Sequence, residues 1–281
     1  MSATLTLPFV RTPARRAGAV TWAFLRMGAR ATFSYPLSFV LLQLGALFQL
    51  VGFLFLSHLT RSSASLGSGY LAFSAVGLAA TQVTSGAILG LGQELEWAIE
   101  QGRFEMLLIE PISWRLIPVA LAAWPMLYRL VNGLVILLAA WGLGAAIGIH
   151  DLPALIGLVV LGMGSSLVIG VAAGALRVLA KRGDPIATIY SMSVQILSGV
   201  FVPINVFPKP LRVIAWFFPN TYLNSGMRKV LMSHSSQVYG PSSTEAMLLL
   251  FGFCAVLLPW SMWIFGRSLE TGRKYGVLAG Y

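Results

Sequence analysis

Six long stretches of this chain contain no Asp, Glu, Lys, Arg or His, and they constrain the fold more than any other feature. They are Ala31–Ser57, Ser62–Gln93, Leu130–Ile149, Leu152–Leu176, Pro185–Pro208 and Ala246–Gly266. A helix needs about 20 mostly apolar residues to cross the roughly 30 Å hydrocarbon core of a bilayer. The sequence therefore predicts an all-α polytopic membrane protein with six membrane-spanning helices.

Two shorter apolar segments do not meet this length. Leu116–Tyr128 and Val213–Met227 are too short or too interrupted to span alone. Because a charge at the bilayer centre costs at least about 2.5 kcal/mol, we expect Arg129 near the inner interface, with Leu116–Tyr128 as a tilted or interfacial lead-in broken near Pro125. The alternative is a buried Arg129 that pairs with a carboxylate in a polar pathway.

The charge balance gives the orientation. Only 10% of the 281 residues are charged, against about 25% in soluble domains, which excludes a soluble enzyme. The formal net charge of +10 suggests nucleic acid, but a mean hydropathy of +0.80 excludes such a partner. With the N-terminus inside, fourteen Lys and Arg fall in inner segments and five in outer segments. Since basic residues stay on the cytoplasmic side, both termini are predicted to be cytoplasmic.

Residues 1–33 are predicted to form a cytoplasmic segment with an amphipathic helix. Arg15, Arg26 and Arg30 project within a roughly 60° arc, away from apolar residues such as Phe24. Such a helix lies on the inner leaflet. A signal peptide with Ala17–Leu25 as its apolar region is the alternative, although Arg26 and Arg30 follow directly after it. The predicted organisation continues with a transmembrane domain over 34–266 and a cytoplasmic tail over 267–281.

Catalytic and metal-binding groups are sparse. Cys254 is the one cysteine, and the three histidines show no HExxH spacing. We therefore expect no metal site and no catalytic residue.

The inner loop over 93–115 is the loop whose composition most indicates a function. It carries five of the nine carboxylates without a nucleophile or His beside them, and an apolar turn over Phe104–Ile109 lies between Gly102 and Pro111. An exposed apolar turn is costly unless a partner covers it. A docking element is favoured over an ordinary solvated loop.

Two blocks of sequence resemble a known family. The pattern E-x-G-R-F-E-x-L-L-x-x-P-I-S from Glu100 to Ser113 is similar to the cytoplasmic loop of ABC-2-type transporter permeases. A second block resembles the end of that family's fifth span. It comprises Ser198-Gly199-Val-Phe201-Val-Pro203, Phe207-Pro208, Leu211, Pro219-Asn-Thr-Tyr222 and Gly226-Met-Arg228. With six spans and an amphipathic N-terminal helix, the resemblance covers nearly the whole chain.

The resemblance implies an ATPase-coupling site that docks on a separate nucleotide-binding subunit. Its residues are Gly102, Arg103, Phe104, Glu105, Leu107, Leu108 and Pro111. Glu105 is expected to face basic residues of that subunit, and the apolar turn to fill a groove in it. ATP and Mg²⁺ would bind the partner, because this chain has no Gly-Lys dipeptide and hence no P-loop. Two permease chains, as homodimer or heterodimer, would meet in a bacterial inner membrane.

Polar residues on the second and fifth predicted spans form a candidate pathway: Thr81, Gln82, Ser85, Thr188, Ser191, Gln195 and Ser198. Their hydroxyls could alternatively bond only to their own helices.

The segment 206–240 is expected to form short re-entrant helices, since irregular backbone at membrane depth must be covered. The expected outer cap is Pro203, Trp216, Phe217, Phe218 and Tyr222. A loosely packed outer loop is the alternative. Gly144/Gly148 and Gly170/Gly174 have the spacing of close helix contacts.

The predicted cargo is an amphipathic, lipid-like molecule, drug or antibiotic that is exported, because the candidate lining combines apolar residues with hydroxyls and amides and has no fixed charge. The alternative within the same architecture is a lipid-linked polysaccharide, which should show aromatic platforms along the pathway. An ion channel would need charged rings or a filter motif, and a membrane-embedded enzyme would need a polar catalytic cluster.

Overall fold

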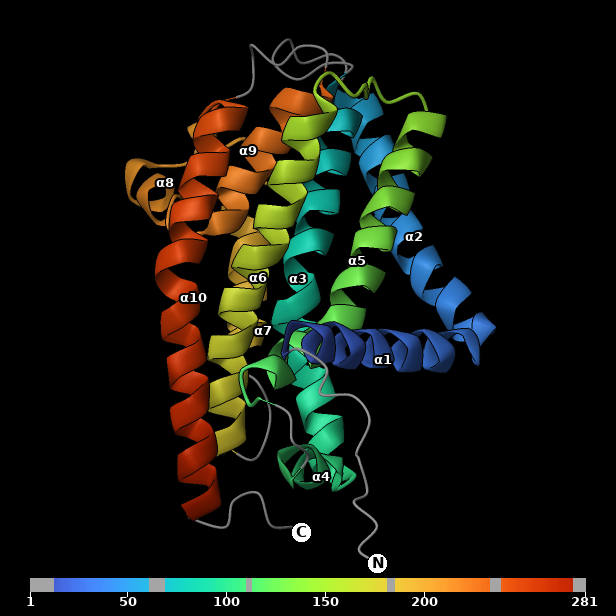
Figure 1. The fold of residues 1–281 in the computed structure, drawn as a ribbon. Coiled ribbons are helices and arrows are strands. Elements are labelled where there is room, and N and C mark those ends of the chain that lie inside the picture. The colour runs from blue at the N-terminus through green and yellow to red at the C-terminus, as the bar shows by residue number, and fades with distance from the viewer. Residues whose placement is uncertain (1–12, 61–68, 110–112, 181–184, 233–238, 275–281) are drawn as a thin grey trace, which may run out of the picture.

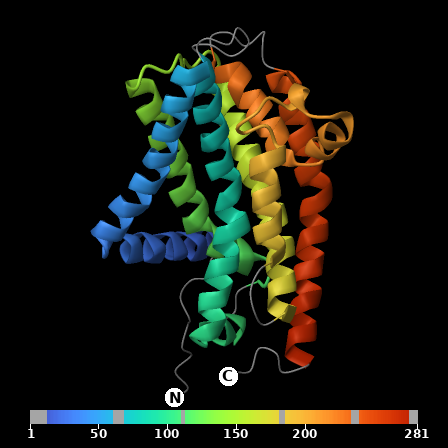
Figure 2. The ribbon, with the colours of Figure 1, turned by 180° about the vertical axis from the view of Figure 1, so that it is seen from behind.

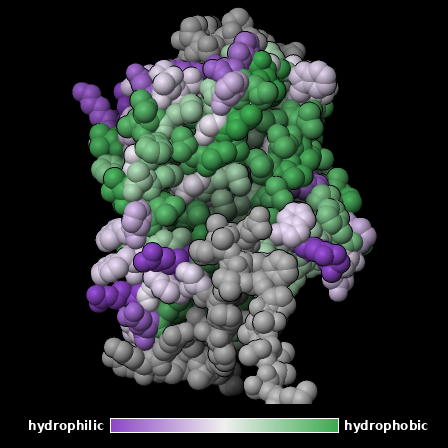
Figure 3. Space-filling model, viewed as in Figure 1, coloured by the Kyte–Doolittle hydropathy of each residue, from purple (hydrophilic) through white to green (hydrophobic). Residues whose placement is uncertain are grey.

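The computed structural model describes residues 13–60, 69–109, 113–180, 185–232 and 239–274, and its regular elements within these ranges are helices (Figure 1). Five of them are long and apolar enough to cross a membrane: α2 (Pro36–Thr60), α3 (Tyr70–Glu100), α5 (Leu116–Gly142), α6 (Leu152–Ala180) and α10 (Ser243–Lys274). Figure 3 shows an apolar belt over the upper part of one face, with polar residues gathered below it at the level of α1 (Pro13–Phe33). The prediction of an all-helical membrane protein is confirmed.

The fifth predicted span, Pro185–Pro208, is not one long helix. The helix α7 (Pro185–Leu197) has 13 residues, and at about 1.5 Å per residue it is about 20 Å long, too short to cross alone. The chain turns at Gly199, whose φ of +76° favours glycine. This turn could not be predicted from apolar composition alone.

The expected break near Pro125 is wrong, because α5 continues through Pro125 from Leu116 to Gly142. The proline ring lies against α3 at Gly90, where an added Cβ would collide with it. One turn away, a Cβ at Gly86 would lie 2.9 Å from the Cα of Met126. Two glycines on α3 thus make room for α5, and packing keeps the helix continuous across its proline.

Helix α3 lies between α5 and α6 at the centre of the bundle (Figures 1 and 2). A Cβ added at Gly170 on α6 would lie 2.5 Å from the carbonyl oxygen of Ala87, and one at Gly174 would lie 2.8 Å from Leu95. These glycines therefore bring the backbones of α3 and α6 into close contact. Gly144, with φ of +89°, lies in the turn after α5 instead.

Gly170→Leu is expected to lower the free energy of unfolding by about 2–3 kcal/mol, because the side chain must displace the backbone of α3. Thermal unfolding of the purified protein measures this effect. The matched control is Gly252→Leu on α10, where an added Cβ meets nothing within 4 Å. Equal melting temperatures for the two variants would contradict the assigned contact.

The N-terminal helix α1 lies across the direction of the long helices (Figure 1). It packs on α5 at Gly28, which lies against the Trp124 ring, and Trp124 Nε1 donates to Thr32 Oγ1 at 3.0 Å. Arg26 and Arg30 are exposed. The helix expected within residues 1–33 is therefore present and has an exposed basic face.

Three short helices follow α7: the 3₁₀ turn η2 (Ile204–Val206), α8 (Lys209–Ala215) and α9 (Pro219–Leu231). Helix α9 begins midway along α3, where Thr84 Oγ1 donates to Asn220 Oδ1 at 3.0 Å. It ends beside the α5–α6 connection, where Gly148 N donates to Leu231 O at 2.9 Å. After α7 the chain therefore leaves the bundle. It returns to the middle of α3 at the start of α9 and then follows α9 to the α5–α6 connection.

Candidate functional site

The element α4 (Arg103–Ile109) lies at the lower end of α3, beyond the level of α1 (Figure 1). Gln101 and Gly102 close the end of α3, with Gly102 N donating to Ile99 O at 3.0 Å. The φ of +66° at Gly102 is a conformation that glycine adopts without strain. This turn sends α4 sideways from α3, so that a short helix is presented at one end of the molecule.

The predicted docking residues do not share one environment. Phe104 is 1% exposed and packs in a core cluster with Leu95, Ala98 and Ile117, so its side chain anchors α4 to this chain and does not fill a groove elsewhere. Met106 is 67% exposed. The remaining predicted residues differ as follows: Gly102 and Arg103 are exposed, Leu107 is half-buried, Glu105 and Leu108 lie on α4, and Pro111 lies outside the described residues.

An ion pair holds the lower end of α3 to α6. Arg177 Nη2 and Glu96 Oε2 are 2.9 Å apart. Glu96 lies one turn before the end of α3 at Glu100, and Arg177 lies in the last turn of α6. The end of α3 that carries α4 is therefore tied to a second long helix.

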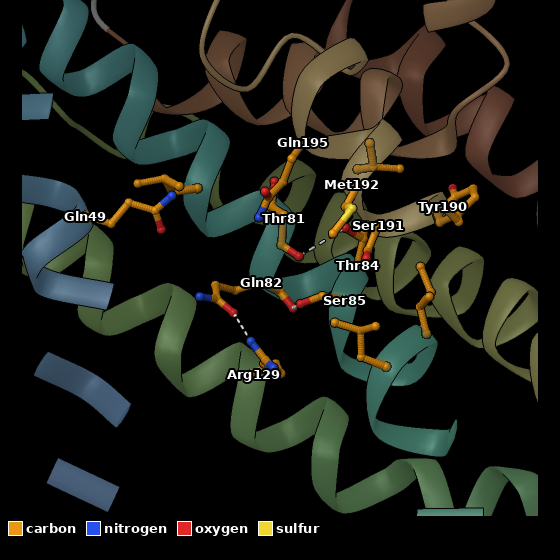
Figure 4. Close-up of a pocket in the computed structure, with 14 residues that line it drawn as sticks. Gln49, Thr81, Gln82, Thr84, Ser85, Arg129, Tyr190, Ser191, Met192 and Gln195 are labelled. Atoms are coloured by element: carbon orange, nitrogen blue, oxygen red, sulfur yellow. Dashed lines mark hydrogen bonds between the residues drawn. The ribbon is translucent and has the colours of Figure 1, made fainter. Parts of the chain in front are cut away.

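A pocket of about 280 Å³ lies between α3, α5 and α7, with Gln49 contributed by α2 (Figure 4). Its lining residues are Gln49, Leu78, Thr81, Gln82, Thr84, Ser85, Ile88, Leu89, Arg129, Tyr190, Ser191, Met192, Val194 and Gln195. Gln49 and Gln195 are exposed, so the pocket opens at the surface of this chain. Helices distant in sequence thus gather hydroxyls and amides around one cavity.

Five of the seven predicted pathway residues line this pocket: Thr81, Gln82, Ser85, Ser191 and Gln195. Their hydroxyls also bond to their own helices, since Thr81 donates to Gly77 O at 2.9 Å and Ser191 to Thr188 O at 2.9 Å. Thr188 is exposed and outside the lining. Ser198 is buried in a separate network with α9.

Arg129 lies midway along α5 and lines the pocket. Its expected position near the inner interface stays a prediction. Its Nη1 donates to Gln82 Oε1 at 2.9 Å (Figure 4). Of the alternative, the carboxylate partner is wrong, because the guanidinium pairs with the amide of Gln82. The reason is that α5 is continuous, so that Arg129 lies near the middle of this helix and beside Gln82 on α3.

A buried polar network joins α3, α7 and α9, and sequence reasoning missed most of it. Asn220 accepts from Thr84 and donates through Nδ2 to Ser198 Oγ at 2.8 Å, while Asn224 Nδ2 donates to Ser198 O at 3.0 Å. Asn220 and Asn224 are each 1% exposed. The Pro-Asn-Thr-Tyr pattern at 219–222 was the sequence feature that could have indicated this network.

Arg228 on α9 is enclosed by backbone and by one aromatic ring. Its Nη2 donates to Phe73 O at 3.1 Å and to Val200 O at 3.0 Å, and its guanidinium carbon lies 3.4 Å from the centroid of the Phe73 ring. A Cβ at Gly77 would lie 2.7 Å from Nη2, so only glycine leaves room for the guanidinium. Arg228 therefore connects α9 to the turn after α7 and to α3.

The predicted outer-cap residues form two small clusters. Trp216 packs on Tyr222 with ring centroids 5.3 Å apart, and Tyr222 donates its hydroxyl to Trp216 O at 2.8 Å. Phe218 meets Tyr190, a pocket residue, at 5.4 Å. Phe217 is 79% exposed and belongs to neither cluster. Pro203 precedes η2 and is half-buried.

No group of three or more His, Cys, Asp or Glu that could hold a metal ion occurs among the residues the structure describes. Comparison with known proteins points to one family: a family model described as "ABC-2 type transporter" matches residues 17–232, more than half of the chain. A search of curated proteins finds no match.

Proposed function

The chain belongs to the ABC-2 type transporter family, and we propose from this premise that it is the permease subunit of an ATP-driven exporter of amphipathic molecules. The observation that carries the proposal lies on α3. This one helix contributes Thr81, Gln82 and Ser85 to the pocket, and its lower end bears α4. A force applied to α4 therefore reaches the pocket through a single helix.

The proposed coupling begins with an ATPase subunit that docks on α4. Met106 offers the subunit an exposed apolar contact, and Phe104 fixes α4 rigidly to the core cluster. ATP and Mg²⁺ bind the ATPase subunits, whose closure shifts the α4 helices. Rigid-body movement of packed helices is a common form of such transitions, and here it would switch the pocket between inward- and outward-facing states.

Two permease chains are needed to enclose the pathway. The pocket opens at the surface beside Gln49 and Gln195, and α2 diverges from the bundle toward its lower end (Figure 2). A second copy, identical or homologous, would cover this open side.

The proposed membrane orientation follows from α1. With its basic face at the inner leaflet of a bacterial inner membrane, α4 and both termini lie in the cytoplasm. Helices α8 and α9 then lie at the outer half, and α9 starts at membrane depth as a re-entrant helix, covered by α3, α6 and α10. The buried side chain of Asn220 supports this, because its oxygen and nitrogen both find partners away from water, in Thr84 and Ser198.

Co-purification tests the proposed function. The permease is co-expressed with the Walker-type ATPase expected in a neighbouring reading frame, reconstituted in vesicles and supplied with a fluorescent phospholipid analogue. The complex is expected to stay together and to move the analogue only with ATP. Transport that persists without the ATPase subunit, or purification without any such subunit, would refute the proposal.

A further inference from the structure

The pocket contains one fixed charge. The guanidinium of Arg129 lines it, and none of its fourteen described lining residues is Asp or Glu. Among the residues the structure describes, the polar partner of this guanidinium is the neutral amide of Gln82, at 2.9 Å. The cavity is thus cationic, although it lies between long apolar helices.

A cation between membrane-spanning helices is energetically costly, so its presence indicates a function. Ionisable side chains within membrane-spanning segments are rare, and they mark binding sites and pathways. A guanidinium has five N–H donors in a planar fork, which matches a carboxylate or phosphate in two-point contact. Gln82 accepts from only one of these nitrogens.

The rest of the lining is suited to an amphipathic anion. The hydroxyls of Thr81, Ser85 and Ser191 donate to carbonyls of their own helices. Thr84 also donates to a carbonyl of its own helix, at Ala80. The other lining donors are Arg129, the hydroxyl of Tyr190 and the amides of Gln49, Gln82 and Gln195, and Figure 4 shows Arg129 and Gln82 facing each other. Leu78, Ile88, Leu89 and Met192 supply apolar surface for a hydrocarbon chain.

We propose that this pocket selects amphipathic cargo with an acidic headgroup, a carboxylate or a phosphate, and that Arg129 binds this group while Gln82 orients the guanidinium. The inference rests on the proposed export function and replaces the uncharged lining assumed from sequence with a cationic one. It assigns Arg129 as the residue that determines specificity.

The test uses the complete transporter in nanodiscs of phosphatidylcholine and four probes with the same C12 chain: dodecanoate, dodecyl phosphate, dodecanol and dodecyltrimethylammonium. Wild type is expected to bind the two anions at least about tenfold more tightly than dodecanol, as a charge-assisted two-point contact provides. Arg129→Gln should remove this preference and leave dodecanol binding unchanged. Arg129→Lys should retain part of it, because the charge stays but the fork is lost.

Two controls separate charge in the pocket from charge elsewhere and from misfolding. Arg26→Gln removes an exposed arginine on α1 and should preserve the preference. Gln82→Leu keeps the cation but removes its partner, and it should reduce the preference several-fold. An anion preference that survives in Arg129→Gln with an unchanged melting temperature would overturn the assignment.

ATP-driven movement, measured with the same complex reconstituted in vesicles, separates cargo from a resident lipid. Dodecyl phosphate that binds through Arg129 and is exported with ATP supports the cargo assignment. If it binds through Arg129 and is never moved, while the neutral probe is exported, the site holds a lipid headgroup and the cargo assignment fails. Failure of all probes to move with ATP refutes the exporter function itself, and the binding comparison still reports on Arg129.

Discussion

Exchanging Glu105 for arginine is expected to uncouple ATP hydrolysis from transport while membrane insertion stays intact. Glu105 lies on α4 between the buried Phe104 and the exposed Met106. If α4 docks on basic residues of the ATPase subunit, the reversal places like charges in contact. We expect about 30-fold weaker binding of that subunit, which corresponds to about 2 kcal/mol.

The measurements are the affinity of the reconstituted permease for the ATPase subunit and the ratio of ATP hydrolysed to cargo moved. Glu270→Arg is the matched control, since Glu270 is exposed near the lower end of α10 and receives the same charge change. Unchanged coupling in Glu105→Arg would count against docking at α4.

A companion variant separates docking from transmission. Phe104→Ala removes the anchor that joins α4 to the core cluster, while Met106 stays exposed. It should keep most of the affinity for the ATPase subunit but lose transport per ATP hydrolysed. Loss of affinity alone, with normal transport per ATP, would show that Phe104 serves docking.

Truncation of Arg228 to alanine is expected to be the most destabilising change in the outer half of the molecule. Arg228 is 4% exposed, and its guanidinium binds the carbonyls of Phe73 and Val200. Alanine leaves a cavity and deprives both carbonyls of a charged donor. The two effects together should lower the free energy of unfolding by about 3 kcal/mol and the melting temperature by about 5–10 °C.

Thermal unfolding of three variants measures this role. Arg212→Ala is the matched control, because Arg212 also donates to backbone carbonyls, at Asn205 and Phe207, but is only half-buried. Arg212→Ala should lower the melting temperature much less than Arg228→Ala. Arg228→Met should recover part of the stability, since an apolar side chain of similar length fills the cavity without a buried charge. Wild-type melting of Arg228→Ala would contradict the proposed connection.

The length of an apolar run could be predicted from sequence better than its division into helices. Five predicted spans correspond to long helices, because the bilayer requirement depends on local composition. The break at Pro125 was wrong, since Gly86 and Gly90 on α3 accommodate a continuous α5. The end of α7 at Leu197 was missed, because a turn at Gly199 leaves the apolar run unbroken.

The residues of the candidate pathway could likewise be predicted within one helix but not between helices. Helical spacing grouped Thr81, Gln82 and Ser85, and all three line the pocket, because residues three to four apart share a face. It could not bring Arg129 to Gln82, since that pairing depends on the register between α3 and α5.

By itself the sequence determined a helical membrane protein with an amphipathic N-terminal helix and an apolar turn between Gly102 and Pro111. These properties follow from hydropathy, charge and helix-breaking residues, which act over a few neighbouring positions. Only the tertiary structure decided that Phe104 points inward, that Arg129 faces the pocket and that Arg228 joins α9 to α3. The physical reason is that the environment of a side chain depends on which neighbouring helix covers it, and helices far apart in sequence set that contact.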